Sequence, residues 1–351
     1  MPEMTSRERV LRTFRFEKTD RAPFDLMESV VWDELQDWFT REMGLANKDQ
    51  VLDHFGVDFR WFWAAPEAPD GVNLKSEEYL MTSVPGSWSD HVVERPLKDV
   101  RSVSGLAEKH KWIVPEWWNV SPARDFRKKY QDKAIVMLVH HTMLFMTACE
   151  FFGAEEALVR LASADEVMTE FLRCQCEFAV NSFQYACNQV QGAVDVCWLM
   201  DDVATQRALM MHPSLWRDCF KEFLRREVKA IHDNNMFALF HSCGSIRDIL
   251  PDLIEIGIDG VLPFQTTARG MDADSIAKDF GGKILFYGGM DIQQLLTFGS
   301  EEDVRREVRK NIDLFAAHGG YVVANSHHCI QNIKPENICA MLDEARNYRS
   351  A

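Results

Sequence analysis

The sequence predicts an α/β protein built as a (β/α)8 TIM barrel. From residue 134 onward, short runs rich in Val, Ile and Leu alternate with amphipathic helical patterns. This alternation is typical of parallel strands that are buried on both faces. Polar residues of the metal-ligand and acid–base types follow several of these runs, where α/β barrels place their active sites. A chain of 351 residues is long for one domain but suits a barrel with insertions.

Six strands can be predicted in this part of the chain: Ala134–Val139, Gly192–Trp198, Met236–Phe240, Gly260–Pro263, Lys283–Tyr287 and Tyr321–Ala324. Arg21–Asp25 is a candidate for one more. Helices are expected between them at residues 154–161, 214–234, 246–256, 272–280, 301–317 and 335–348. No Gly-rich phosphate loop follows any strand, so a nucleotide-binding fold has no support. The strand count favours an eight-stranded barrel over a doubly wound sheet.

The first 130 residues are predicted to form an N-terminal extension that packs on the barrel, within one domain of residues 1–351. Ser6–Phe16 and Trp32–Met43 have helical patterns, and Tyr79–Glu94 is predicted to form a β-hairpin around Pro85 and Gly86. The region is rich in aromatic residues, including Phe59, Trp61, Phe62 and Trp63. These side chains either pack the extension onto the barrel or form a wall for an aromatic substrate.

The composition favours a cytoplasmic enzyme with a small-molecule substrate. A net charge of −15 with no basic stripe argues against nucleic acid and anionic membranes as partners. No run of about 18 apolar residues is present, which argues against a membrane span, and the N-terminus lacks the apolar segment of a signal peptide. Nine cysteines, an odd number, fit reduced thiols. Cys174 and Cys176 lie in a helical pattern that turns them to different faces, so we interpret them as structural.

The stretch Phe237–Gly244 predicts a buried strand that ends in two soft-metal ligands. Residues i and i+2 of a strand share a face, so His241 and Cys243 can converge on one ion, and Gly244 lets the chain turn away. A second pair, His328 and Cys329, follows another apolar run. Three ligands from two strand ends would form a zinc site with an open position, with Cys329 or His328 as the third ligand. The alternative is a buried His beside a packing Cys.

Further candidates follow other strands. Asp201 and Asp202 are adjacent, so they point in opposite directions; at most one faces the site, and the other caps a loop or helix. His141 is a third candidate catalytic residue, although a structural role is somewhat favoured for it. The pair Gly288–Gly289 allows close approach of the chain itself or of a flat ligand.

With these residues the chain resembles the uroporphyrinogen decarboxylase superfamily, and within it the cobalamin-dependent methyltransferases. The resemblance covers nearly the whole chain and rests on several motifs together: Thr5–Phe14 with Lys18–Phe24, Asp201–Gln206 with Pro213–Trp216, His241–Gly244 with Pro251–Gly257, Gly288–Asp291, and Ile330–Gln331 with Pro335–Asn337. It implies a barrel with zinc at the C-terminal ends of the strands. Thiol-methylating members use a His-x-Cys pair and a distant Cys. Here His328 occupies that distant position and Cys329 follows it, an order more similar to the O-demethylase methyltransferase I components.

The resemblance implies a zinc-dependent methyltransferase that moves a methyl group from a small methoxylated, aromatic substrate to a Co(I) corrinoid. His241, Cys243 and Cys329 or His328 would hold Zn²⁺, and Asp201 or Asp202 would assist the leaving oxygen. Gly289, Met290 and Asp291 are candidates for contact with cobalamin. The chain has no Asp-x-His carrier motif, so a partner corrinoid protein would bring the cofactor. A homodimer is a possible assembly.

Three alternatives stay open. The first is transfer in the opposite direction, from methylcobalamin to a zinc-bound thiol. The second is a decarboxylase of the uroporphyrinogen type, which fits poorly because the Arg-rich motif of that enzyme is absent from Arg21–Glu28. The third is a corrinoid-binding protein that keeps the barrel but has no catalytic activity.

Overall fold

The protein is a (β/α)8 barrel, as the sequence predicts. The computed structural model describes residues 3–26, 33–74, 95–139, 142–330 and 332–350. Within them, parallel strands pair with their neighbours in chain order around the sheet. These strands are β1 (Phe59–Pro66), β3 (Ala134–Val139), β4 (Val196–Met200), β5 (Phe237–His241), β6 (Gly260–Phe264), β7 (Leu285–Met290) and β8 (Tyr321–Asn325). The short β2 (Trp118–Asn119) pairs antiparallel with the end of β1.

The barrel closes through residues 21–25, which lie between β8 and β1. Phe24 forms a parallel bridge with Val323, and Asp25 N–H donates to the Val323 carbonyl at 2.9 Å. On the other side, Asp58 N–H donates to the Phe24 carbonyl at 3.1 Å. This segment therefore takes the place of the remaining barrel strand, which confirms the prediction that Arg21–Asp25 contributes one.

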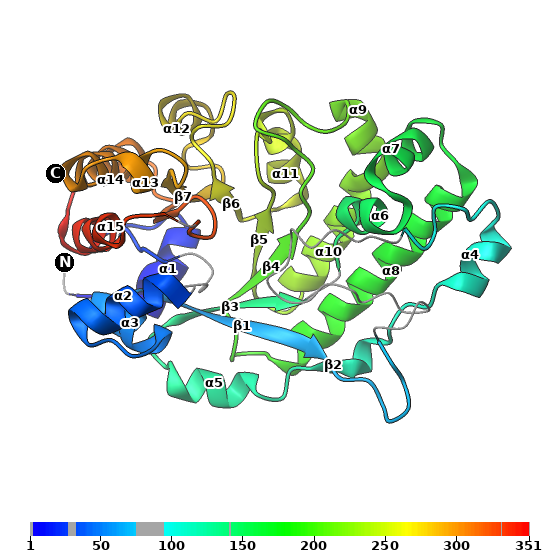
Figure 1. Cartoon of the computed structure of the whole chain (residues 1–351), viewed down its shortest axis with the longest axis horizontal. Helices are drawn as coiled ribbons and strands as arrows, with labels where there is room; N and C mark the ends of the chain where they lie inside the picture. The colour runs from blue at the N-terminus through cyan, green and yellow to red at the C-terminus, as the bar shows by residue number, and fades with distance from the viewer. Residues whose placement is uncertain (1–2, 27–32, 75–94, 140–141, 331, 351) are drawn as a thin grey trace.

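Helices surround the sheet and cover the strands, and the two chain ends lie on the same side of the molecule (Figure 1). The helices are α1 (Ser6–Phe14), α2 (Asp33–Met43), α3 (Lys48–Phe55), α4 (Val103–Lys109), α5 (Ala123–Lys129), α6 (Phe145–Phe152), α7 (Ala154–Ala162), α8 (Glu166–Gln189), α9 (Pro213–Trp216), α10 (Glu222–His232), α11 (Leu250–Ile256), α12 (Ala273–Phe280), α13 (Leu295–Phe298), α14 (Glu301–Ala316) and α15 (Pro335–Asn347). Capping residues explain several starts; at α14, for example, Ser300 and Asp303 form a capping box. The helix expected at 214–234 is divided into α9 and α10 by a π-helical turn at Arg217–Lys221.

Two hydrophobic cores meet at the sheet. The inner core fills the barrel with side chains from alternate strand positions, among them Val136, Trp198, Leu239 and Tyr287. Helix α1 adds Val10 and Phe14 to this core at the N-terminal ends of the strands, and the Phe14 ring stacks on Phe237 at 4.8 Å. The outer core lies between strands and helices. The inner core is therefore packed and closed at its base, which leaves its C-terminal end for ligands.

Strand β1 is a correction to the predicted extension. The aromatic run at 59–63 belongs to the barrel sheet, where Phe59 and Trp61 face the inner core and Phe62 faces the outer one. Arg60, buried within this run, interrupts the apolar pattern; its guanidinium bonds to Asp53 and to nearby carbonyls. The barrel sheet thus begins within the first 130 residues. The hairpin predicted at Tyr79–Glu94 lies outside the described residues.

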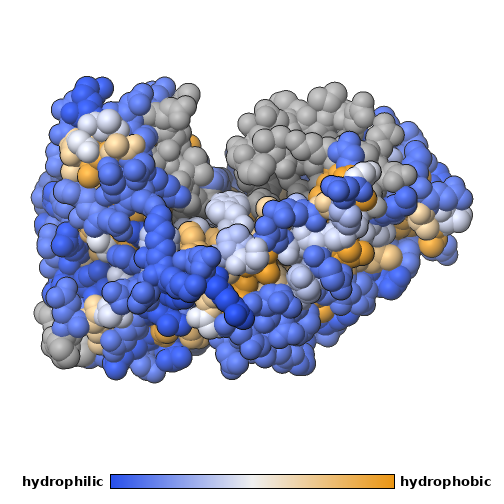
Figure 2. Space-filling model, turned by 90° about the horizontal axis from the view of Figure 1, so that it is seen from below, coloured by the Kyte–Doolittle hydropathy of each residue, from blue (hydrophilic) through white to orange (hydrophobic). Residues whose placement is uncertain are grey.

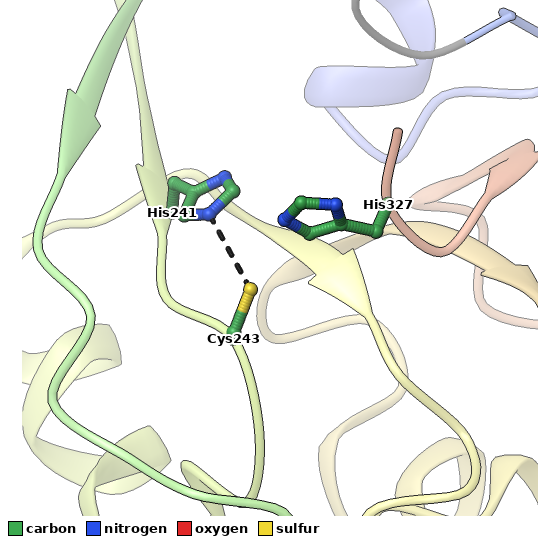
Figure 3. A group of neighbouring side chains, drawn as sticks. All are labelled: His241, Cys243 and His327. Carbon is green, nitrogen blue, oxygen red and sulfur yellow. Dashed lines mark hydrogen bonds between the residues drawn. The ribbon is translucent and has the colours of Figure 1, made fainter. Parts of the chain in front are cut away.

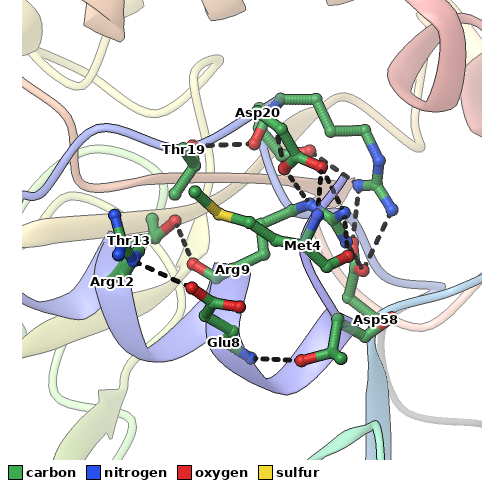
Figure 4. Close-up of polar contacts among 12 residues, drawn as sticks. Met4, Glu8, Arg9, Arg12, Thr13, Thr19, Asp20 and Asp58 are labelled. Atoms are coloured by element: carbon green, nitrogen blue, oxygen red, sulfur yellow. Dashed lines mark hydrogen bonds and ion pairs between the residues drawn. The ribbon is translucent and has the colours of Figure 1, made fainter. Parts of the chain in front are cut away.

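A buried ion network holds the closing segment against β1 (Figure 4). Asp58 is fully buried and accepts hydrogen bonds from Arg9 (2.7 Å), from both terminal nitrogens of Arg21 (2.7 and 3.0 Å) and from Phe24 N–H (3.0 Å). Arg9 also pairs with Asp20 at 2.6 Å. One carboxylate therefore joins α1, the closing segment and the first residue before β1.

The face of the molecule in Figure 2 is mostly hydrophilic, and several of its hydrophobic residues lie toward the middle. In the described residues, no helix combines the length and the apolar character needed to cross a membrane.

Substituting Asp58→Asn should destabilise the protein by about 3–5 kcal/mol, because it leaves the buried Arg21 guanidinium without a counter-charge. Urea unfolding of the variant measures this loss. Asp125→Asn is the matched control: it breaks an ion pair with Lys128 in which both side chains are exposed, and stability should hardly change. Equal stability of the two variants would contradict the role given to Asp58.

Candidate metal centre and active site

Strand β5 delivers His241 and Cys243 to the C-terminal mouth of the barrel. His241 is its last residue, pairs in register with Met200 on β4 and Leu262 on β6, and is 4% exposed. The chain then turns at Gly244, whose φ is +86°. A side chain there would collide with the carbonyl of Thr205, so the turn requires glycine. The turn keeps Cys243 beside the imidazole instead of carrying it away.

A third donor, His327, comes from the loop after β8. One potential ligand atom from each of His241, Cys243 and His327 lies within 4.8 Å of the others. Cys243 Sγ is 3.7 Å from His241 Nε2, and the two imidazole centroids are 6.2 Å apart. Figure 3 shows His327 directed at the other two from the opposite side of the mouth. Two strand ends far apart in sequence therefore converge on one point.

Burial keeps both imidazoles in the neutral form that binds metals. It lowers the pKa of His241 well below the ordinary value, and neighbouring His327 lowers it further. Burial also lowers the pKa of His327. His241 Nδ1 has no hydrogen-bond partner among the described residues, so packing orients this ring. One packing partner is Trp198, whose ring centroid lies 5.1 Å away.

The donor set fits a zinc ion. Two imidazoles and one thiolate are ligands that zinc accepts, and three protein ligands leave a fourth position for a water or substrate. A closed structural zinc site would instead have four protein ligands. The residues present are thus able to hold a metal for catalysis.

The structure places the two residues expected as the third ligand differently from His327. Cys329 is turned into the outer core, where Asn325 Nδ2 approaches its sulfur at 3.8 Å and burial raises the pKa of its thiol to about 12. The His328 ring contacts His327 at 4.8 Å, and burial lowers its pKa to about 3. Neither residue is in the group that converges with His241 and Cys243, so the geometry replaces both by His327.

Asp202 faces the site and Asp201 faces away from it. The Asp202 carboxylate accepts Cys243 N–H at 2.6 Å and lies 3.6 Å from His241 Nε2, and burial raises its pKa. Asp201 instead accepts the N–H groups of Phe145 and Met146 at the start of α6, at 2.9 and 2.8 Å. Burial raises the pKa of Asp201 to about 7. His141, the remaining candidate catalytic residue from the sequence, lies outside the described residues.

Gly289, Met290 and Asp291 have internal roles in the structure. A side chain at Gly289 would collide with the Tyr321 hydroxyl, and Met290 is fully buried. Asp291 accepts N–H groups from Gln293 and Gln294 at the start of α13. Packing and capping thus explain these residues, and their contact with cobalamin stays a prediction.

Two residues at the mouth were not singled out from the sequence. His327 is the first of the three metal-donor residues His327, His328 and Cys329 that follow β8, but no periodicity beyond the strand end indicates which of the three turns inward. Trp198 was visible only as part of a strand. Its even spacing from Met200, which pairs with His241, was the signal that could have placed it on the inner face.

The fold and the mouth define a barrel protein with an active-site-like group of metal donors, and comparison with known proteins identifies its family. The uroporphyrinogen decarboxylase (URO-D) family model matches residues 123–348, more than half of the chain, so the chain belongs to this family. No curated protein matches it.

The chain is similar in structure to a methyltransferase from Methanosarcina mazei. The two are 16% identical, the match covers 98% of each chain, and the TM-score is 0.64, a likeness that bears on the fold. A xylose isomerase-like TIM barrel protein from Mycobacterium smegmatis, solved in complex with magnesium, matches at 13% identity over 71% of this chain and 92% of that chain. Its TM-score of 0.36 supports no further argument.

Metal analysis of two serine variants distinguishes the donor set in the structure from the one expected from the sequence. Wild-type protein should bind about one zinc per chain at His241, Cys243 and His327. Cys243→Ser should lose the metal, whereas the matched control Cys329→Ser should keep it. Plasma mass spectrometry on untagged protein measures both. Loss of zinc in Cys329→Ser with retention in Cys243→Ser would reverse the assignment.

Proposed function

We propose that the protein is a zinc-dependent methyltransferase that demethylates a small methoxylated aromatic compound. The methyl group would pass to the Co(I) corrinoid of a partner carrier protein. The observation that carries the proposal is the convergence of His241, Cys243 and His327 at the barrel mouth. The Methanosarcina mazei protein of the same fold is described as a methyltransferase, which is in line with this proposal.

The three donors have one task in this reaction, which is to hold the metal with a position open toward the substrate. Zinc, when bound, supplies a Lewis acid for an ether oxygen. The neutral state of both imidazoles suits this task, since no proton has to leave them before they bind a metal. The Cys243 backbone is held by the Asp202 carboxylate, which keeps the thiol beside His241.

Asp202 is the group best placed to deliver a proton. If the methyl–oxygen bond of the substrate broke, the electron pair would stay on the oxygen, and the corrinoid of the partner would supply the acceptor for the methyl group. Burial raises the pKa of the Asp202 carboxyl, which favours its protonated form and suits it to donate a proton to that oxygen. Asp201, turned toward α6, takes no part in this step.

The N-terminal arginines give no support to decarboxylation of a polycarboxylate. Arg9 and Arg21 are engaged with Asp20 and Asp58 in the network that closes the barrel. They are therefore not available to bind substrate carboxylates. A net charge of −15 likewise offers no attraction for a polyanion.

The test is methyl transfer from a methoxyarene to free cob(I)alamin with zinc-loaded protein. We expect wild type to convert Co(I) to methyl-Co(III), followed by absorbance, and Cys243→Ser to be inactive. Demethylation of methylcobalamin by a thiol, without reaction of any methoxyarene, would support transfer in the opposite direction. Zinc binding and cobalamin binding without turnover in either assay would support a non-catalytic corrinoid-binding protein.

Asp202→Asn should reduce kcat about a hundredfold or more, because the amide cannot deliver the proton. Its zinc content should stay near one per chain, since Asp202 is not a donor in the group. Asp201→Asn is the neighbouring control and should lower thermal stability through the α6 cap while it retains turnover. An Asp202→Asn enzyme with unchanged kcat would remove the proposed proton donor.

A further inference from the structure

We infer that the indole N–H of Trp198 binds a second oxygen of the aromatic substrate, one that is separate from the methyl ether. Trp198 would then be a specificity-determining residue that selects methoxylated rings with an additional oxygen substituent. The inference rests on the proposed function and names the substrate class more closely.

Trp198 lies beside the metal donors on the inner face of the barrel. It is on β4, two residues before Met200, which pairs in register with His241. Its ring centroid is 5.1 Å from that of His241, with a tilt of 56° between the planes. A ligand bound beside His241 would therefore have Trp198 as a neighbour.

The Trp198 N–H is a donor without an acceptor. The side chain is 1% exposed, and its Nε1 has no hydrogen-bond partner among the described residues. A buried donor without a partner destabilises the folded protein. Such a group next to a reaction centre has a physical explanation if a ligand supplies the missing acceptor.

Trp61, a neighbouring indole of the inner core, has a hydrogen-bond partner for its N–H. Trp61 packs edge-to-face against Trp198 at 5.2 Å, and its Nε1 donates to the buried Asp25 carboxylate at 2.8 Å. Tyr287 OH also donates to Asp25, so this carboxylate fixes two aromatic rings of the inner core. The ring centroid of Trp63, which is 37% exposed, lies 6.3 Å from that of Trp198. Trp198 is thus held in a rigid position by its neighbours, with its donor left for another partner.

The chemistry of this wall favours a neutral or anionic aromatic ligand. Indole rings offer flat apolar surface to another ring. Indole faces also attract cations, but a buried N–H donor without a partner favours an oxygen acceptor instead. Because a zinc ion held by the three donors would engage the ether oxygen, the Trp198 N–H remains for a second oxygen, such as a ring carboxylate.

The experiment compares two ligands on three zinc-loaded proteins by titration calorimetry: 3-methoxybenzoate, which has a second acceptor, and anisole, which does not. The proteins are wild type, Trp198→Phe and Trp118→Phe. Trp118 is the matched control, because it is also buried with an unpartnered Nε1 but lies in the outer core against Phe178. Zinc content and thermal midpoint are measured for each.

We expect Trp198→Phe to weaken binding of 3-methoxybenzoate about tenfold and to leave anisole binding unchanged. Loss of the indole N–H should not itself lower the thermal midpoint, since this group has no hydrogen-bond partner among the described residues. Trp118→Phe should change neither affinity. Where turnover is measurable, KM for 3-methoxybenzoate should rise in Trp198→Phe and that for anisole should not.

Equal loss for both ligands, no loss for either, or loss of zinc in Trp198→Phe would overturn the inference. Selective weakening of 3-methoxybenzoate in a protein that transfers no methyl group would leave the Trp198 subsite standing and reject the proposed reaction. Failure of wild type to bind either ligand would reject the aromatic substrate class and the subsite together.

Discussion

The site depends on how the barrel closes. Residues 21–25 are the link between β8 and β1, and the fully buried Asp58 carboxylate holds them through Arg9, Arg21 and Phe24 N–H. This closure positions β8, whose following loop carries His327. It also inserts Asp25 into the inner core, where the carboxylate orients Trp61 and Tyr287. An ion network at one end of the closing segment is therefore connected, through a few side chains, to the donors at the mouth.

The buried polar groups of the barrel fall into two kinds. Asp25, Asp58 and Asp201 each accept hydrogen bonds from nearby donors, as structural carboxylates do. Trp198 Nε1 and His241 Nδ1, by contrast, have no partner among the described residues. An orphan atom alone is weak evidence, since Trp118 in the outer core has one too. What gives the Trp198 donor meaning is its position beside three converging metal donors, because local rules tend to be broken at functional sites.

The sequence predicted most of the barrel because its strands are apolar on both faces, and it predicted the His241–Cys243 pair because strand periodicity places them together. Strand β1 is not predicted from the sequence, because Arg60 interrupts its apolar pattern and the aromatic residues around it suggest an extension packed on the barrel. The alternation of side chains along an extended chain requires Asp201 and Asp202 to point in opposite directions, but it does not determine which of them faces the barrel mouth. His327, His328 and Cys329 follow the end of β8, where periodicity no longer applies. The choice among them depends on how the loop turns, which is a tertiary property.

The side chains at the barrel mouth differ in charge from those that a polycarboxylate substrate would require. A site for a polycarboxylate needs cations directed at the ligand, but here Arg9 and Arg21 neutralise Asp20 and Asp58 inside the protein. The mouth instead gathers neutral imidazoles, a thiol, a carboxyl and indole rings. Such groups suit a ligand recognised by a flat ring and a few oxygen atoms. The same closure that needs the arginines therefore removes them from ligand binding, so recognition at the mouth has to rely on soft donors and aromatic surface.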